Sequence, residues 1–259
     1  MVWSLLTILF FPGCTHKPFG DPIPADTRKI REAAYHGYID RIASCNKAFD
    51  GEIRIEWAHP GSSFKAAGFF RTMIPSSVFV SILNPLDQPL FVATVTDGQY
   101  QAVNTGKRTY FAGSLKTYGL LNDIPVAFLS GKWGCLLAGR PSAEAEVEQI
   151  YQDPAERGTW FALTDPATGD ITEYLLVDLT TDTMRERIIV NDDGNTEATI
   201  TYTAWQERDR CRQPEEIEIT GLDFGASALI RLSDIHGATL TRKDFTIPVP
   251  PHYLRQYTP

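Results

Sequence analysis

The 259-residue sequence predicts a single, mostly β domain built on an antiparallel sheet. Apolar and polar residues alternate over many short segments, as in Ile53-Arg-Ile-Glu-Trp57. Turn signals such as Asp97-Gly98 separate most of these segments, which is typical of β-hairpins. Hydrophobic residues make up 43% of the chain, so a sizeable core can be buried. A long antiparallel meander follows from these three observations.

One long helix is expected before the strands, from Asp26 or Thr27 to about Ser44, with Asp26 or Thr27 as its N-cap. The apolar residues of this segment recur every four positions and predict one buried stripe. They are Ile30, Ala34, Tyr38 and Ile42.

About eleven strands are expected in all. In the first half they lie near 53–57, 64–73, 78–82, 90–95, 100–103 and 109–112. In the second half they lie near 160–164, 171–177, 184–190, 198–205, 215–220 and 228–235. Between the halves, 114–153 predicts short helices, and its acid-rich stretch 142–151 predicts a further helix or a solvated loop.

The N-terminus resembles a secretory signal. The apolar stretch from Val2 to Phe11 is shorter than the roughly 20 residues that span a bilayer, and it matches the apolar core of a signal peptide. Gly13 and Cys14 resemble a lipobox, in which cleavage leaves an acylated cysteine. We therefore expect residues 1–13 to be a signal peptide and Cys14 to be lipidated. A secretory signal followed by an ordinary cysteine is the alternative.

The Pro-rich segment 14–25 is expected to be a tether, with one domain over 26–259. A Pro-rich chain extends about 3.1 Å per residue, so this tether would hold the domain roughly 30 Å from its anchor. Thr15, rather than Asp, follows Cys14, which is compatible with the outer membrane of a Gram-negative bacterium. If Cys14 is acylated, Cys45, Cys135 and Cys211 leave at most one disulfide and one free thiol. The sequence does not choose the pair, and buried thiols fit equally well.

Several function classes are excluded by the sequence. The net charge is -8, and no run of Lys or Arg provides an electrostatic footprint for nucleic acid. The five histidines form no metal-binding motif, and there is no nucleophile elbow or phosphate loop. Acidic pairs such as Glu215-Glu216 fit solvated faces better than acid–base dyads. We therefore expect no enzyme, no metal and no cofactor.

A wide curled sheet must fill its concave side with side chains, with helices or with a ligand. Alternation predicts that one apolar face lines a ligand cavity through Ile53, Ile55, Trp57, Phe64, Phe70, Val80, Ile82 and Phe91. The central region predicts a lid that contains Leu120, Leu121, Phe128 and Trp133. Ordinary core packing explains the same periodicity, and a shift of one residue would turn the whole set to the other face.

Leu86 stands out in the turn Asn84-Pro-Leu-Asp-Gln-Pro89, because turns usually favour polar residues and Gly. An isolated exposed Leu is normal in itself. Leu86 alone therefore gives only a weak indication of function.

Several segments together resemble the LolA/LolB-type lipoprotein carriers, with the LolB-like outer-membrane receptor as the nearest type. In the first half these are Phe49-Asp-Gly51, Ile53-Arg-Ile-Glu-Trp57, Asn84-Pro-Leu86 and Asp97-Gly98. The run from Ile124 to Pro141 is similar to the family's lid segment, and Phe245-Thr-Ile-Pro-Val-Pro-Pro251 to a frequent ending. Asp87 departs from the family, which often has Gly there, and the second half is longer than expected.

The resemblance implies an unclosed antiparallel β-barrel of about eleven strands, with helical lids over an apolar cavity that holds acyl chains. It also implies that Leu86 reaches toward the membrane. The expected protein is lipid-anchored at the outer membrane and faces the periplasm. It would bind acyl chains of lipoproteins or lipids, received from a periplasmic carrier protein. The alternative is an envelope lipoprotein with a solid core that serves as a structural or protein-interaction module.

Overall fold

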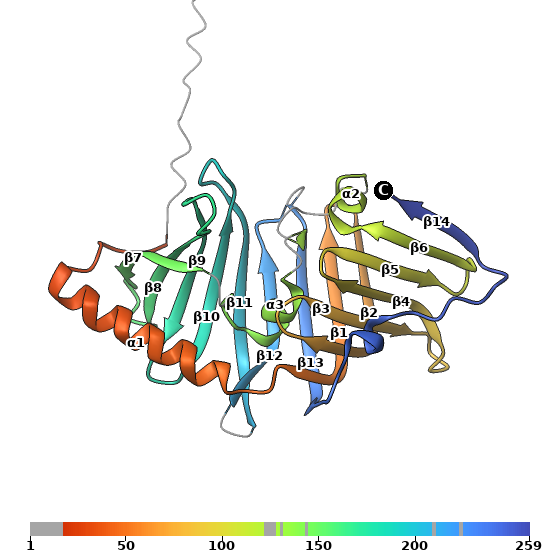
Figure 1. The fold of residues 1–259 in the computed structure, drawn as a ribbon, viewed down its shortest axis with the longest axis horizontal. Coiled ribbons are helices and arrows are strands. Elements are labelled where there is room, and N and C mark those ends of the chain that lie inside the picture. Colours follow the sequence, from red (N-terminus) through yellow and green to blue (C-terminus); the bar gives the residue numbers. More distant parts are fainter. Residues whose placement is uncertain (1–17, 122–127, 130–131, 143–144, 209–210, 223–224) are drawn as a thin grey trace, which may run out of the picture.

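A computed structural model describes residues 18–121, 128–129, 132–142, 145–208, 211–222 and 225–259. The described chain forms one wide sheet with its helices on one side (Figure 1). The helices are α1 (Ala25–Ala43), α2 (Leu115–Leu121) and α3 (Trp133–Ala138), with a 3-10 turn at Arg242–Phe245. None of the helices in the described ranges is long and apolar enough to span a membrane.

The sheet has fourteen strands. The first group is β1 (Ala48–His59), β2 (Ser62–Met73), β3 (Ser77–Leu83), β4 (Pro89–Thr96), β5 (Gln99–Asn104) and β6 (Thr109–Ser114). The second is β7 (Glu146–Gln152), β8 (Thr159–Thr164), β9 (Ile171–Asp178), β10 (Thr183–Val190), β11 (Thr196–Arg208), β12 (Cys211–Thr220) and β13 (Ser227–Gly237). The last strand is β14 (Leu254–Thr258).

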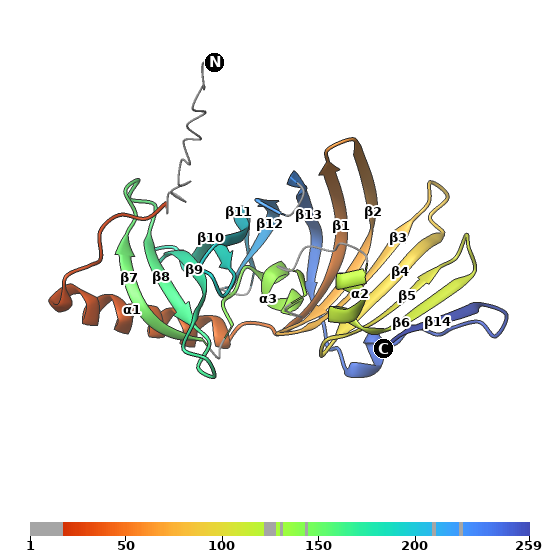
Figure 2. The ribbon, with the colours of Figure 1, turned by 90° about the horizontal axis from the view of Figure 1, so that it is seen from above.

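Two antiparallel meanders, β1–β6 and β7–β13, join through antiparallel pairing of β1 with β13. β14 then adds to β6 in parallel. The sheet therefore runs from β14 to β7 without closing, and it curves openly when seen from above (Figure 2). The predicted mostly β, antiparallel and unclosed architecture is confirmed.

The fourteen strands exceed the expected number of about eleven. Twelve of them overlap the segments predicted from alternation, and the other two, β7 and β14, lack a clear alternating pattern. Segment 142–151 was predicted to be a helix or a loop, and that prediction is wrong for β7, which pairs with β8. Its acidic residues Glu146 and Glu148 are exposed, whereas Ile150 is fully buried. A single buried residue in an acidic segment gives too little periodicity to identify a strand.

Helix α1 lies across the β7–β10 end of the sheet (Figure 1). It buries Tyr35 and Tyr38, and the Tyr35 ring lies 4.4 Å from the ring of Phe161 in β8. Ile30 was predicted to lie on the buried stripe, but it is 70% exposed. A helix turns about 100° per residue, so a strict four-residue repeat drifts about 40° per step away from the buried face.

The predicted cap of α1 is also wrong. The helix begins at Ala25, after Pro24, and no side chain caps it. The amides of Thr27 and Arg28 donate to the Pro24 carbonyl, at 3.0 and 2.9 Å. Pro24 itself occupies the N-cap position with an extended backbone (ψ 149°), so Asp26 and Thr27 lie inside the first turn of the helix.

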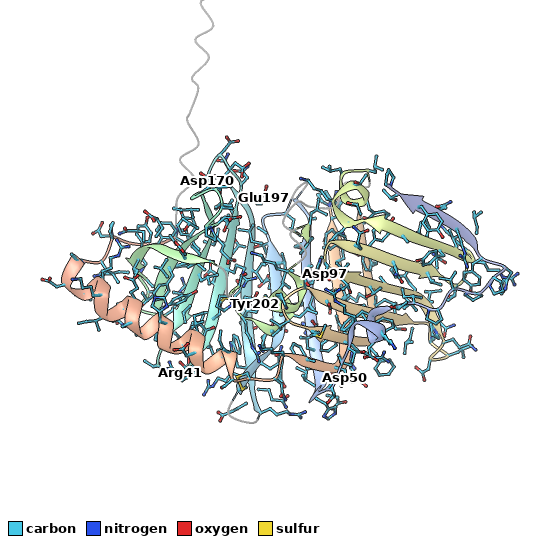
Figure 3. The ribbon with its side chains drawn as sticks, viewed as in Figure 1. Arg41, Asp50, Asp97, Asp170, Glu197 and Tyr202 are labelled. Carbon is cyan, nitrogen blue, oxygen red and sulfur yellow. A yellow bond between two sulfur atoms is a disulfide. The ribbon has the colours of Figure 1, made fainter. Side chains whose placement is uncertain are left out.

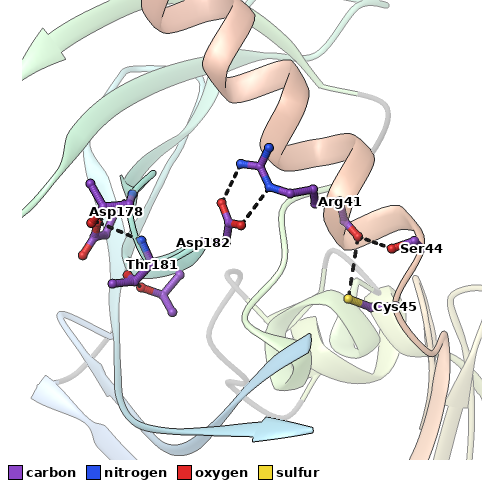
Figure 4. A network of polar contacts seen from close by, with 8 residues as sticks. Arg41, Ser44, Cys45, Asp178, Thr181 and Asp182 are labelled. Atoms are coloured by element: carbon purple, nitrogen blue, oxygen red, sulfur yellow. Dashed lines mark hydrogen bonds and ion pairs between the residues drawn. The ribbon is translucent and has the colours of Figure 1, made fainter. Parts of the chain in front are cut away.

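The C-terminal end of α1 is fixed to the sheet. Arg41 forms a two-pronged ion pair with Asp182, with nitrogen–oxygen distances of 2.6 and 2.8 Å (Figure 4). Two residues beyond the helix, Cys45 forms a disulfide with Cys211 of β12. Cys135 is a buried free thiol, and burial raises its pKa. The structure thus selects one of the pairings that the sequence left open.

Part of the expected tether lies against the domain. The amides of Gly20 and Ile23 donate to the carbonyls of Gln152 and Ile150 in β7, at 2.9 and 3.0 Å. The Phe19 ring packs 4.5 Å from Tyr151 and 4.7 Å from Tyr174, on the side of the sheet away from α1. This segment shields the edge of β7, which would otherwise present unpaired backbone groups.

Candidate functional site

Backbone register determines which side chains share the α1 side of the sheet, because directly opposed residues on neighbouring strands point to the same face. One row of opposed residues crosses from β8 to β2. It consists of Phe161, Leu175, Arg187, Ile200, Ile219, Ala228, Trp57 and Phe64. Since Phe161 contacts Tyr35 of α1, Trp57 and Phe64 lie on the same side as the helix.

All eight predicted cavity residues belong to this face. Phe70 is opposite Val80, and Ile82 is opposite Phe91. Ile53 and Ile55 alternate in step with Trp57 along β1. We call this surface, formed by the inward side chains of β1–β6, the concave apolar face.

The eight residues form a gradient of burial along the strands. Ile53 and Phe70 are buried in the main core, and the middle four side chains are half-buried. Phe64 and Phe91, toward the β1–β2 and β3–β4 hairpin ends, are 54% and 37% exposed. The concave apolar face is therefore closed at one end and open to solvent at the other.

The concave apolar face carries no formal charge. Every Asp, Glu, Lys and Arg of β1–β6 alternates onto the opposite, convex face: these are Asp50, Glu52, Arg54, Glu56, Lys65 and Arg71. On that face Glu56 pairs with Lys65 at 2.8 Å and with Arg231 at 2.7 Å. These exposed ion pairs contribute little to stability. The formal charges of β1–β6 therefore lie on the convex face alone.

The other half of the α1 side is filled and contains a buried ion pair. Arg187 of β10 lies 3.2 Å from Glu173 of β9 and donates to the Arg140 carbonyl at 2.6 Å. Tyr202 lies near the middle of the molecule (Figure 3). Burial raises the pKa of Tyr202 to about 12, so its hydroxyl stays neutral. The β7–β12 half is therefore a packed core with a polar centre, unlike the concave apolar face.

Sequence patterns did not reveal the Arg187–Glu173 pair. The register of β10 against β9 shifts between Met184 and Glu186, which turns both Met184 and Arg187 toward the core. A bulge of this kind breaks strict alternation. An Arg in a segment rich in charged residues therefore gives no warning of its burial.

The four predicted lid residues divide into two pairs. Phe128 is buried and stacks on Trp133 at 5.1 Å, and both pack into the main core. Leu120 and Leu121, at the end of α2, are exposed. Residues 122–127 and 130–131, which belong to the same predicted lid, lie outside the described residues.

Helix α3 lies between the two halves, against β2, β3 and β12. α3 is held to both halves: Gln213 of β12 donates to the Leu137 carbonyl at 2.7 Å, and the Cys135 amide donates to the Pro75 carbonyl, between β2 and β3, at 3.1 Å. Arg187 of β10 donates to the Arg140 carbonyl just beyond the helix. Arg140 in turn donates to the Asn46 carbonyl at 2.9 Å. α3 therefore acts as a fixed partition between the packed half and the concave apolar face.

Leu86 lies at the tip of the β3–β4 hairpin and is 77% exposed. The side-chain oxygen of Asn84 accepts from the amides of Leu86 and Gln88, at 2.9 and 3.0 Å. Asp87 adopts a left-handed backbone with φ of 56°, a region that favours Gly. Local hydrogen bonds thus hold an apolar side chain in water.

Two N-terminal predictions and the question of a metal site remain. The signal peptide and Cys14 lie outside the described residues. Within the described part of the chain, no group of three or more His, Cys, Asp or Glu side chains could hold a metal ion.

No protein-family model and no curated protein sequence matches the chain. Solved structures do match. A LolA superfamily protein from Nitrosomonas europaea has a TM-score of 0.54 at 13% identity, covering 83% of this chain and 97% of its own. A DUF1329 family protein from Desulfovibrio piger has a TM-score of 0.57 at 9% identity, covering 83% and 96%.

A third structure is described as an outer membrane lipoprotein-sorting protein domain from Vibrio parahaemolyticus. It has a TM-score of 0.52 at 10% identity, covering 82% of this chain and 94% of its own. In all three comparisons nearly the whole of the solved chain is matched, so the likeness concerns the complete architecture. The chain therefore has the fold of the LolA superfamily.

Proposed function

We propose that this protein binds the acyl chains of lipoproteins or lipids on its concave apolar face, in the envelope of a bacterium. One observation carries the proposal: the inward side of β1–β6 is apolar, free of formal charge and partly open to solvent. A face of this kind is costly to leave in water unless something covers it. The likeness to a lipoprotein-sorting domain supports the choice of ligand.

The physical basis of binding is the transfer of methylene groups out of water. Each buried methylene contributes about 0.8 kcal/mol, so even a partly covered chain gains several kcal/mol. Phe64, Phe91 and the half-buried Trp57 offer aromatic surface at the open end. The charged pair Arg187–Glu173 makes the other half less suitable for a hydrocarbon chain, because hydrocarbon placed against it would remove water from two charged groups.

We further propose that Cys14 is acylated and anchors the protein to the outer membrane, facing the periplasm. The cargo would come from a periplasmic carrier protein, and Leu86 would contact the bilayer during delivery. The lipobox-like Gly13-Cys14 and the exposed position of Leu86 support this version.

A matched pair of variants tests the binding face. Phe91 and Phe69 are both exposed, at 37% and 51%, but Phe91 is on the concave apolar face and Phe69 is on the convex face. We expect Phe91→Asp to weaken binding of a fluorescent fatty acid by about tenfold or more, since it places a charge against hydrocarbon. Phe69→Asp should bind as the unmodified chain does.

Equal weakening by both variants would contradict the proposed face. Failure of the unmodified chain to bind the fatty acid would favour the interaction-module alternative, in which the concave side serves only as a core. Far-ultraviolet circular dichroism of both variants shows whether the fold is retained.

A further inference from the structure

Three segments that are distant in sequence meet at one corner of the sheet. Thr105, in the β5–β6 turn, donates its hydroxyl to the Pro89 carbonyl at 2.7 Å and its amide to the Leu90 carbonyl at 3.1 Å. The amide of Leu254, at the start of β14, donates to the Arg108 carbonyl at 3.0 Å. We call the β3–β4 turn with Leu90, the β5–β6 turn and the start of β14 the hairpin rim.

The hairpin rim exposes three leucines. Leu86 is 77%, Leu90 48% and Leu254 62% exposed. They come from two of the three segments, yet the hydrogen bonds through Thr105 and Arg108 join these segments into one surface. Three exposed leucines along one end of a sheet offer apolar surface that a partner or a membrane could cover.

The same rim is basic. Lys107, Arg108 and Arg255 are all exposed, and no ion pair involves them within the described residues. Asp87 is the one acidic side chain among the residues that define the rim. This local excess of positive charge contrasts with the net charge of -8 for the whole chain.

We propose that the hairpin rim docks on a bilayer surface that contains anionic phospholipid. The leucines would enter the headgroup region, and the three cations would lie against lipid phosphates. A basic residue near an anionic surface contributes about 1 kcal/mol, and the effect fades within a Debye length. The rim thereby supplies the lipid class for the membrane contact of the proposed function, on which this inference rests.

The charge of the whole molecule gives this docking a direction. A chain with net charge -8 is repelled by an anionic membrane in most orientations. The three cations of the hairpin rim would reverse that repulsion locally. The rim would therefore face the bilayer while the concave apolar face beside it holds the acyl chain.

Vesicle co-sedimentation of the mature chain, residues 14–259 with Cys14→Ala, tests the proposal, because this form lacks both the apolar signal segment and the expected acyl anchor. The vesicles are phosphatidylcholine alone, or phosphatidylcholine mixed with phosphatidylglycerol. We expect tighter binding to the anionic vesicles, and on the order of tenfold weaker binding there after Lys107→Glu with Arg255→Glu. The control is Lys29→Glu with Arg31→Glu on α1, which changes the net charge equally.

A second pair of variants tests the leucines. Leu86→Glu should weaken binding to both kinds of vesicle, whereas Ile30→Glu, at a similarly exposed apolar position on α1, should not. Equal effects of the rim pair and the α1 pair, or no preference for anionic vesicles, would overturn the proposal. Fatty-acid binding by the same samples separates the two ideas: a protein that binds fatty acid but ignores lipid charge refutes the rim alone. A protein that prefers anionic vesicles but binds no fatty acid refutes the proposed function alone.

Discussion

Eight apolar side chains share the concave apolar face, but their surroundings assign them different tasks. Phe70 is fully buried and meets Phe49 edge-on at 6.0 Å between ring centres. Phe64, on the same face of the same strand, is 54% exposed and stacks loosely on Trp57 at 6.5 Å. Burial therefore separates the residues that hold the fold from those free to contact a ligand.

This difference in burial predicts that the same substitution at two positions of β2 affects mainly stability at one and mainly ligand binding at the other. Phe70→Ala should lower the free energy of unfolding by about 3–5 kcal/mol, because it leaves a cavity in the core. Phe64→Ala should cost less than about 1 kcal/mol, since a half-exposed side chain loses little burial, yet it should weaken fatty-acid binding. Urea unfolding and a fatty-acid titration on both variants check this. If the two variants lost stability equally, the division of the face into core and ligand surface would be wrong.

At the scale of elements, the sequence predicted most strands and missed what depends on tertiary packing. Alternation along β1 and β3 was enough to place Ile53, Trp57 and Val80 on one face. The docked segment at Phe19 could not be predicted, because a short Pro-rich stretch has no periodicity. Its position against β7 is set by Tyr151 and Tyr174, which are distant in sequence.

Helix α1 is a fixed cover and not a moving lid. Residues 20–23 hold its N-terminal end to β7, and the Arg41–Asp182 pair and the Cys45–Cys211 disulfide hold its C-terminal end. Over the concave apolar face, α2 instead leaves Leu120 and Leu121 exposed.

The disulfide should contribute strongly to stability, because it joins residues 166 positions apart. Closing so long a loop restricts the unfolded chain, so Cys45→Ser with Cys211→Ser should lower the free energy of unfolding by about 2–5 kcal/mol. Guanidinium unfolding with and without reductant measures this. The reductant should destabilise the unmodified chain and a Cys135→Ser control, but not the double variant. Unchanged stability of the unmodified chain in reductant would contradict the role assigned to the bridge.

The whole molecule combines two halves of one sheet with different interiors. The β7–β12 half is packed under α1 around Arg187 and Glu173, whereas the β1–β6 half presents the uncharged concave apolar face. Periodicity alone could not distinguish these interiors, since Ile217 in the packed half and Ile55 on the open face alternate alike. The difference arises from what covers each half, which depends on the complete fold.

Photo-cross-linking with a diazirine-bearing fatty acid tests the central claim most directly. The unmodified chain is irradiated with the bound probe, and the labelled peptides are identified by mass spectrometry. We predict labels on the peptides that carry Phe64, Ile82 and Phe91, and their loss in the presence of excess palmitate. Labels confined to the convex face, or to the packed half around Leu175, would contradict the account.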